Sequence, residues 1–560
     1  STMPSREEMW ARLGGEVDVL IVGGGINGAG IARDAARRGL SVALVEKDDL
    51  ASGTSSRSSK LIHGGLRYLE SYEFSLVFEA VSERRVLLDL APHLVHPLGF
   101  LFPVYKGSRK KLGVIRAGMW LYDGLSLFRS PKIHKSLSPG EVAELEPAVK
   151  QEGLRGAPLY FDCATDDARL TLEVALDATH AGATVVTHAK VESFIEENGR
   201  VVGAKIRSSR NGQEKTVRAK VVVNATGPWT DLTRRLSRGD ASPILRVTKG
   251  VHIVVEHDKL PIHNAVVCFH PKDDRVLFAI PWGDRSYIGT TDTDFDGDLD
   301  DLYATADDVR YLLEAAAAYF PEHPLTASDV IATWAGLRPL IAPEGDREGV
   351  SESKVSREHQ ILVGEDGLIT IAGGKLTTFR RMSAEVVDTV VRLLRLADAA
   401  PRELAESRSD RVPLPGALGW PENDDPTKVV ARVRETGGAA IDEKIAAHLT
   451  SVYGMVAIQV AGLCAADPSL ATPLVEGRPE ILAQVDWAVH RELAASVSDV
   501  MIRRTQLYFR DVDQGLSAVP AVADRMAELL RWTPEERERS IAEYVAEVER
   551  SRRFRAGLGI

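Results

Sequence analysis

The sequence predicts an α/β chain of several domains that ends in an all-α domain. Three observations support this prediction. A strand–helix–strand pattern opens the chain, short alternating strands dominate residues 245–295, and residues 428–549 are rich in Ala, Glu and Arg with helical periodicity. The 560 residues exceed what one hydrophobic core supports, so we expect two or three domains.

The composition limits the classes of function. The chain is 44% hydrophobic and 27% charged, which is ordinary for a globular protein. Its net charge of −11 argues against a nucleic-acid partner, and an anionic ligand would need a local cluster of cations. The three cysteines are far apart and lack metal or redox spacing, which predicts neither zinc nor disulfides and favours a reducing cytoplasm. Residues 1–16 do not resemble a secretion signal, and no apolar run reaches the roughly 20 residues of a membrane span.

The N-terminal pattern predicts a Rossmann-like βαβ unit. Val17–Val22 and Ser41–Glu46 are the strands, and Ala29–Arg38 is the helix. The turn between them matches G-x-G-x-x-G, which allows a pyrophosphate to approach the backbone at the helix N-terminus. Glu46 stands where an acid binds a ribose 2′-hydroxyl and disfavours a 2′-phosphate. An adenine dinucleotide is therefore expected on Gly23, Gly25, Ile26, Asn27, Gly28 and Glu46.

Further elements follow from periodicity and turn residues. Helices are predicted at Ser75–Leu90, near Glu141–Leu145 and from Thr377 to Leu396. Strands are predicted at Ala183–Thr187 and Lys220–Val223 on either side of a hairpin at Asn198-Gly199, and at Val251–Val255, Val276–Ile280, Tyr287–Gly289, Ile361–Gly364 and Leu368–Ile371. The Pro-containing residues 401–425 are typical of a linker.

The segment Thr54–Leu69, TSSRSSKLIHGGLRYL, distinguishes between dinucleotides. Taken whole, it resembles the FAD-dependent glycerol-3-phosphate dehydrogenases of the aerobic, quinone-linked type, in which this run borders the flavin. The resemblance continues in order through DARL (167–170), VNATGPW (223–229), KGVHIVV (249–255), IGTTD (288–292), GLRPL (336–340) and GGKLTT (373–378). One departure is Val251, where the family often has Ser; the C-terminal part matches only in general character.

The resemblance implies a fold and its boundaries. The fold is a Rossmann-like FAD-binding domain of the glutathione-reductase/D-amino-acid-oxidase type with a β-rich substrate domain. We expect the FAD-binding domain at 1–90, 155–245 and 335–396, and the substrate domain at 91–154 and 246–334. A linker at 397–425 and a helical domain at 426–560 complete the chain. The further cofactor contacts implied are Thr54, Ser55, Ser59, Lys60, Leu61, His63, Ala225, Thr226, Gly227, Gly336, Gly374, Leu376 and Thr377.

The implied reaction is oxidation of sn-glycerol 3-phosphate at C2 to dihydroxyacetone phosphate. It requires a phosphate clamp, for which the planar fork of arginine is suited. The family positions associated with substrate are Arg67, Tyr68, Arg338, Arg357 and Lys375. The candidate catalytic residues are His252, His63 and Arg338. The two histidines are candidates because histidine titrates near the working pH, and Arg338 because an arginine in the site could share the proton. The identity of the proton acceptor stays open among the three.

The electron acceptor and the partners are less constrained. The resemblance implies a membrane quinone; the alternatives are an oxidase that uses O2, on glycerol 3-phosphate, an amine or a hydroxy acid, and a non-catalytic flavoprotein. The basic segment Lys106–Lys111 precedes the apolar segment Leu112–Phe128, which favours a peripheral membrane contact. The alternative is a surface loop followed by a buried helix. The basic segment Arg552–Arg555 is a weaker candidate for the membrane contact. We expect a homodimer at the inner face of the cytoplasmic membrane.

Two near-matches to other motifs were rejected. Asp292–Asp298 imitates the start of a calcium loop, but Tyr303 replaces the bidentate Glu, so an acidic loop is the preferred interpretation. Gly373–Leu376 imitates a phosphate-binding loop but lacks its first Gly and its Ser/Thr. We therefore predict neither a metal site nor an ATP site.

Overall fold

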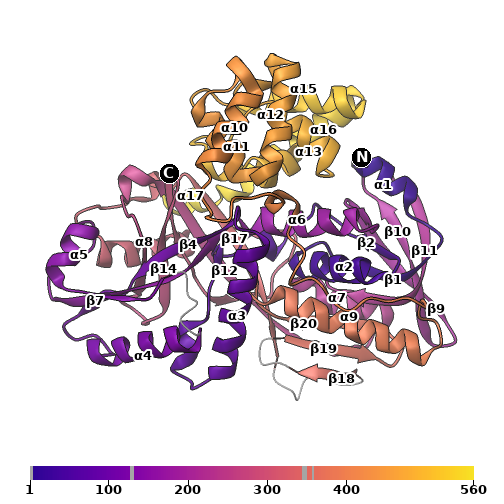
Figure 1. Ribbon diagram of the computed structural model, residues 1–560, viewed down its shortest axis with the longest axis horizontal. Helices are drawn as coiled ribbons and strands as arrows, with labels where there is room; N and C mark the ends of the chain where they lie inside the picture. Colours follow the sequence, from indigo (N-terminus) through magenta and orange to yellow (C-terminus); the bar gives the residue numbers. More distant parts are fainter. Residues whose placement is uncertain (1–3, 127–131, 343–349, 356–358) are drawn as a thin grey trace.

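The computed structural model describes residues 4–126, 132–342, 350–355 and 359–560. Two β-sheets lie side by side, and a helical domain made of the C-terminal residues covers one side of both (Figure 1). This arrangement confirms the predicted fold class of an α/β domain with a β-rich domain and an all-α domain.

The first sheet contains the Rossmann-like unit. Its strands run in the order β18-β19-β20-β11-β1-β2-β8, with β10 and β9 extending from β11, and β20, β11, β1, β2 and β8 are parallel. The bounds are β1 Glu16–Val22, β2 Val42–Val45, β8 Thr184–Val186, β9 Ala189–Glu197, β10 Arg200–Ser208, β11 Glu214–Asn224, β18 Val350–Val355, β19 His359–Gly364 and β20 Ile369–Gly373. The helices beside it are α1 Arg6–Arg12, α2 Ile26–Arg38, α6 Asp167–His180, α7 Thr230–Ser237 and α9 Phe379–Leu396.

The second sheet is mostly antiparallel. Its main path is β16-β12-β15-β14-β13-β4-β7-β3, and β17 pairs with β12 along ten residue positions. The bounds are β3 Leu61–Ile62, β4 Val95–Leu101, β5 Val104–Tyr105, β6 Lys135–Leu137, β7 Leu154–Thr165, β12 Leu245–Glu256, β13 Ala265–Phe269, β14 Val276–Trp282, β15 Arg285–Gly289, β16 Thr293–Asp294 and β17 Ala332–Ile341. Its helices are α3 Phe74–Leu90, α4 Leu112–Leu125, α5 Pro139–Leu145 and α8 Ala306–Tyr319.

Two strands of the second sheet extend across expected domain boundaries, which stay predictions. Strand β7 pairs with β4 in the second sheet, although residues from 155 onward were expected in the FAD-binding domain. Strand β17 pairs with β12, although the boundary was expected between 334 and 335. Both strands are long and mostly buried, so their periodicity carries no information about which sheet they join.

The C-terminal domain is a bundle of short helices. They are α10 Thr427–Gly437, α11 Glu443–Tyr453, α12 Ala457–Ala466, α13 Ala483–Arg491, a π-helix at Asp499–Arg504, α14 Leu507–Arg510, α15 Val519–Leu530, α16 Pro534–Ser551 and α17 Phe554–Gly557. A single apolar core joins α13, α15 and α16 to strands of the second sheet. This domain therefore packs as part of the body.

One segment, Glu443–Ala466, has the length and the mean hydropathy, 1.6, of a membrane-spanning helix. It is not one straight helix, because α11 ends at Tyr453 and Gly454 takes φ +59 before α12 begins. The two helices pack against each other in the core of the C-terminal domain. The turn and the packing explain the apolar composition of this segment.

Candidate active site

The glycine-rich turn lies at the carboxyl ends of β1 and β11. Gly23 has φ +115, and a Cβ there would lie 2.1 Å from the carbonyl oxygen of Ala225. A Cβ on Gly28 would lie 1.8 Å from the carbonyl oxygen of Gly23. The turn thus closes so tightly that only glycine fits at these two positions, which leaves the backbone N–H groups of the α2 N-terminus open to a pyrophosphate.

Glu46 stands at the end of β2 beside this turn. Its carboxylate accepts hydrogen bonds from the backbone N–H of Gly24 at 2.8 Å and of Asp48 at 2.7 Å. Burial, followed by the charge of Asp48, raises the pKa of Glu46 to about 7. A ribose hydroxyl that donates to this carboxylate would stabilise its ionised form.

The next part of the site is the loop of residues 47–60, which crosses from the first sheet to the second. Ser55 Oγ accepts from the backbone N–H of Ile26 at 2.8 Å, which ties the loop to α2. Three bonds tie it to the second sheet: Thr54 donates to Leu337 O, Trp334 Nε1 donates to Ser58 O, and Tyr287 donates to Ser59 O. The loop therefore forms a bridge between the dinucleotide turn and the substrate domain.

Lys60, the last residue of this loop, forms a buried ion pair. Its ammonium is 2.7 Å from Asp167 Oδ1, and both side chains are buried. Ser58 donates to the other oxygen of Asp167 at 2.7 Å. The lysine thus neutralises an acid beneath the loop.

His252 lies on β12 against the same loop. Its Nε2 is 2.9 Å from Ser59 Oγ, and its ring stacks on Trp334 with centroids 4.7 Å apart. The side chain is only 2% exposed, and burial, then the charges of Arg338 and Lys60, hold its pKa well below the usual value. His252 is therefore neutral at neutral pH, and its route to the open part of the site runs through the half-buried Ser59.

Arg338 lies on β17 one strand away from the Thr290 loop. Its guanidinium contacts Thr290 Oγ1 at 3.2 Å, the carbonyl of Thr291 at 3.3 Å and Asp292 at 3.3 Å. A Cβ on Gly250 would lie 2.5 Å from this guanidinium, so the arginine covers β12 at Gly250. The side chain is about one-third exposed.

A second group of predicted residues meets where β3 and β20 end. Lys375 Nζ lies 3.7 Å from the ring centroid of Tyr68, a cation–π contact. The backbone N–H of His63 donates to Thr377 Oγ1 at 3.2 Å. His63 Nδ1 accepts from the N–H of Gly65, so the ring is oriented by its own loop.

The remaining predicted residues are distributed around these groups. Leu61 is in β3, Asn27 in α2, and Thr226 and Gly227 follow β11, while Gly374 and Leu376 join β20 to α9. Gly336 in β17 faces Arg57, because a Cβ there would lie 2.6 Å from the Arg57 carbonyl oxygen. Arg67 belongs to the short 3-10 helix Leu66–Leu69. Arg357 lies outside the described residues.

The chain is similar to known proteins over most of its length. A family model for FAD dependent oxidoreductases matches residues 18–380, and one for the C-terminal domain of alpha-glycerophosphate oxidase matches residues 407–537. The chain is 41% identical over 547 residues to glycerol-3-phosphate dehydrogenase 2 of Mycobacterium tuberculosis, covering 97% of this chain and 90% of that protein. It is 37% identical to the aerobic glycerol-3-phosphate dehydrogenase of Staphylococcus aureus, covering 96% and 94%. The chain belongs to the FAD-dependent glycerol-3-phosphate dehydrogenase family.

Solved structures support this membership of the family. The glycerol-3-phosphate dehydrogenase from Bacillus halodurans, crystallised with FAD, superposes with a TM-score of 0.80 at 33% identity over 98% of this chain and 97% of that one. An L-alpha-glycerophosphate oxidase from Mycoplasma pneumoniae superposes with a TM-score of 0.52 at 19% identity, which shows the shared fold alone.

FAD is the cofactor that this family binds, and the described residues fit it. Gly23 and Gly28 leave the space that a pyrophosphate needs, and Glu46 offers a carboxylate to the ribose. The loop of residues 47–60, the Ala225–Gly227 turn and the Gly374–Thr377 turn would border the rest of the cofactor.

A cluster that sequence reasoning missed lies under the Gly64 turn. Asp162 Oδ1 accepts from the Gly64 N–H at 3.1 Å and from Tyr122 at 2.8 Å, and it also pairs with Arg84. Arg84 is in α3 and Tyr122 in α4, so this buried cluster connects two peripheral helices to the loop that carries His63. The sequence gives no signal that singles out these residues, because Arg84 is one of five charged residues in α3, and β7 and α4 each carry a second charged residue.

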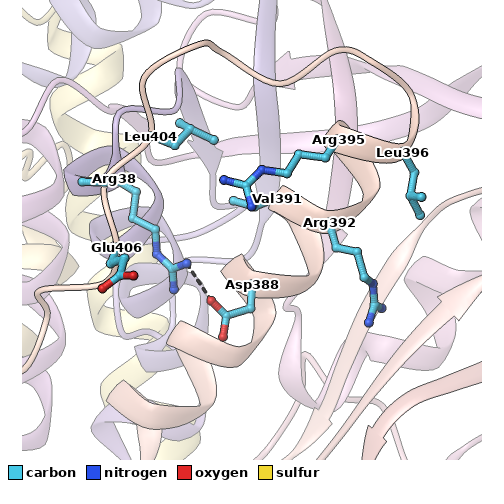
Figure 2. Close-up of a pocket in the computed structure, with 9 residues that line it drawn as sticks. Arg38, Asp388, Val391, Arg392, Arg395, Leu396, Leu404 and Glu406 are labelled. Carbon is cyan, nitrogen blue, oxygen red and sulfur yellow. Dashed lines mark hydrogen bonds and ion pairs between the residues drawn. The ribbon is translucent and has the colours of Figure 1, made fainter.

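The structure also has a cavity of about 530 Å³ away from all of these residues (Figure 2). It lies between the C-terminal ends of α2 and α9 and residues 404–406, and Arg38 in it is already paired with Asp388 at 2.6 Å. Arg392 and Arg395 stand in the last turns of α9, where cations stabilise the helix dipole. The ion pair and the helix dipole therefore explain the charged residues that line this cavity.

Proposed function

We propose that this protein oxidises sn-glycerol 3-phosphate to dihydroxyacetone phosphate and passes the electrons to a membrane quinone. The observation that carries the proposal is the placement of Arg338, the Ser59–His252 pair and the Tyr68–Lys375 pair along the loops that would border the flavin. The near-full-length relatives named glycerol-3-phosphate dehydrogenase support the substrate.

Arg338 and Lys375 supply the cations that the substrate needs. In a chain with net charge −11, a phosphate dianion binds only where local cations outweigh the background. Arg338 offers a partly exposed guanidinium, and a phosphate would bind it in place of the 3.2–3.3 Å contacts to Thr290, Thr291 and Asp292. Lys375 is held over the Tyr68 ring, which fixes its ammonium near the His63 loop.

The Ser59–His252 pair provides a route for the C2 hydroxyl proton. FAD, when bound, supplies the acceptor for the hydride from C2. Ser59 can take the hydroxyl proton while its own proton moves to His252 Nε2, 2.9 Å away. His252 is unprotonated because burial, Arg338 and Lys60 lower its pKa. A phosphate on Arg338 offsets one of these charges and makes the imidazole a stronger base.

Anaerobic reduction of the bound flavin tests the proposed reaction. Glycerol 3-phosphate should bleach the flavin absorbance of the purified holoprotein, whereas glycerol at the same concentration should not. Arg338→Ala should keep its FAD and raise the KM for glycerol 3-phosphate by roughly ten- to a hundredfold, because a charged hydrogen bond contributes about 1.5–3 kcal/mol. If glycerol 3-phosphate leaves the flavin oxidised, the proposal is wrong.

The second candidate function is that of an oxidase that passes the electrons to O2. The match of residues 407–537 to the C-terminal domain of alpha-glycerophosphate oxidase favours it. Reoxidation of the substrate-reduced flavin distinguishes the two functions. A quinone analogue should reoxidise it much faster than air; the reverse order of rates would favour the oxidase.

We also propose that α3 and α4 form the membrane contact. Tyr72, Phe74 and Phe78 on the α3 side and Val114, Trp120 and Leu121 on α4 are exposed, with Tyr72 at 80% and Trp120 at 58%. Exposed basic residues lie next to them, namely Lys106, Arg109, Lys111 and Arg116. This surface is on the side of the molecule opposite the helical domain (Figure 1). An apolar face with a basic border is typical of a monotopic contact with anionic lipid.

Two further observations favour this surface. The 3-10 helix Leu66–Leu69 that carries Tyr68 packs against both α3 and α4, so a quinone dissolved in the bilayer would arrive close to the site. The alternative basic segment Arg552–Arg555 is engaged elsewhere, since Arg552 bonds Asp513 and Arg553 bonds Asp301. Location at the inner face of the cytoplasmic membrane, and a homodimer, stay predictions.

Liposome co-sedimentation tests the membrane contact. The double variant Val114→Glu/Trp120→Glu should lose binding to vesicles that contain anionic lipid, while substrate still bleaches its flavin. Leu232→Glu, at an exposed apolar residue on α7, serves as the control and should bind as the unmodified protein does. Equal binding by the double variant and the control would contradict the assignment.

A further inference from the structure

The helical domain reaches into the FAD-binding domain at one buried acid. Asp49 lies in the loop of residues 47–60, three residues after Glu46, and its side chain is fully buried. Arg503 Nε is 2.6 Å from Asp49 Oδ2, and Arg504 holds both oxygens of Asp49 at 2.8 and 2.9 Å. Both arginines belong to the π-helix Asp499–Arg504, so the loop is bonded to a segment about 450 residues further along the chain.

The turn at Asp49 packs directly on the dinucleotide turn. The backbone N–H of Ala51 donates to Gly24 O at 3.0 Å. A Cβ on Gly24 would lie 2.9 Å from the side chain of Leu50, so no gap separates the two turns. A displacement of Asp49 would therefore move the backbone that faces the pyrophosphate and the carboxylate of Glu46.

The same segment of the helical domain also supports the far end of the loop. Phe509 packs edge-on against Trp334 with centroids 5.5 Å apart, and Trp334 in turn donates to Ser58 O. Gln506 donates to Asp166 Oδ2 at 3.1 Å, next to the Asp167 that binds Lys60. The loop is thus held near both ends by residues 503–509.

The charges in this contact balance one another. Asp499 pairs with His188 at 2.9 Å and with Arg503, while Glu492 pairs with Arg169 at 2.8 Å. Burial lowers the pKa of Arg503 and Arg504, but the carboxylates of Asp49 and Asp499 outweigh it and raise the pKa of both groups. Removal of one partner would leave the buried charges of this contact unbalanced, which favours displacement of the loop toward water.

We propose that Arg503 and Arg504 are positioning residues for FAD: through Asp49 they hold the loop of residues 47–60 in its cofactor-binding conformation. The helical domain then contributes to cofactor retention although none of its residues belongs to the dinucleotide motif. A variant in which the loop is ordered only a tenth of the time would show an apparent FAD Kd about tenfold higher.

The test compares FAD affinity with the stability of the flavin-free protein. The variants are Arg504→Gln, Arg503→Lys and Asp49→Asn in the full chain, and FAD Kd is measured by quenching of flavin fluorescence. The control is Arg525→Gln, which removes a two-bond pair with Asp486 inside the helical domain, away from the loop. Thermal unfolding of each flavin-free variant reports its stability separately.

The expected result is a rise of about tenfold or more in FAD Kd for Arg504→Gln and Asp49→Asn. The double variant Arg504→Gln/Asp49→Asn should have an FAD Kd no higher than that of the weaker-binding single variant, since both changes break the same contact. Arg503→Lys keeps the charge and should bind FAD more tightly than Arg504→Gln. The control should lower the unfolding temperature without changing FAD Kd. An unchanged Kd in Arg504→Gln and Asp49→Asn, or an equal rise in Arg525→Gln, would overturn the proposal.

Discussion

The surroundings of a single site residue, Glu46, determine the pH at which it ionises. Glu46 was predicted from its place after the second strand, and the structure adds its hydrogen bonds to Gly24 and Asp48. Its pKa of about 7 belongs to the flavin-free protein, in which burial favours the protonated acid. The stability that this acid contributes to the flavin-free fold is present below its ordinary pKa of 4.5 and is lost as the pH rises through about 7.

FAD binding should therefore depend on pH through Glu46. A ribose hydroxyl that donates to the carboxylate favours the ionised form, so binding releases a proton below pH 7. FAD affinity should rise by up to about tenfold per pH unit between pH 5 and 7 and level off above. Titrations of flavin fluorescence on the unmodified protein and on Glu46→Gln measure this difference. The same slope in both proteins would assign the linked proton to another group.

The Ser59–His252 pair can be tested at the same scale. Ser59→Ala and His252→Gln should each lower kcat by roughly a hundredfold or more while FAD stays bound, because each removes the same general base. The double variant should be no slower than either single variant. Additive losses would show that the two residues act separately.

These residues also show what the sequence could predict. Glu46 and Gly23–Gly28 follow from local spacing, because the strand, the turn and the helix that place them are contiguous in sequence. The burial of His252 does not, because it depends on Trp334 from another strand and on the loop that carries Ser59. A histidine in an apolar strand marks a position of interest without indicating its surroundings.

At the level of elements, the glycine-rich turn and the loop of residues 47–60 act together. The turn was predicted with its flanking strands and helix, and β1, α2 and β2 confirm it within a few residues. The part of this loop from Thr54 onward was recognised by its resemblance to the family rather than by periodicity. Its bonds to Leu337, Trp334 and Tyr287 reach across to strands that are distant in sequence, so no local pattern encodes them.

Gly28→Ala should reduce FAD binding severely. The added Cβ would lie 1.8 Å from the Gly23 carbonyl oxygen, so the turn must shift. Overpacking costs about 1–3 kcal/mol, which corresponds to a loss of roughly 5- to 150-fold in FAD affinity. Gly118→Ala in α4 is the matched control, since its Cβ would meet nothing within 4 Å and the helix should gain about 0.4–1 kcal/mol. Full flavin occupancy in Gly28→Ala would contradict this description of the turn.

At the level of the whole molecule, the helical domain and the substrate domain share one apolar core. Trp334 and Tyr287 of the second sheet belong to the same cluster as Phe509 and Tyr544 of the C-terminal helices. The sequence predicted a separate helical domain after a linker, and the helices are present. Their docking could not be predicted, because the contact residues are apolar side chains that would fill a domain's own core equally well.

Removal of residues 426–560 should therefore yield a protein that aggregates and lacks flavin. The deletion exposes the apolar surface around Trp334 and removes the side-chain partners that Asp49 and Asp166 have in the helical domain. Exposed apolar patches above a few hundred Å² promote association. Size-exclusion chromatography with detection of flavin absorbance measures both properties. A yellow, monodisperse truncated protein would show that the body folds alone.

The ion pair between Arg504 and Asp49 also determines when, during synthesis of the chain, FAD can bind. The two residues are 455 positions apart, and β11 and β20, which complete the parallel sheet, also emerge long after the glycine-rich turn. At about 5–20 residues per second, the ribosome needs roughly 20–90 s to proceed from one partner to the other. The dinucleotide turn therefore leaves the ribosome early but reaches its cofactor-binding conformation late. FAD should bind at or after release of the finished chain.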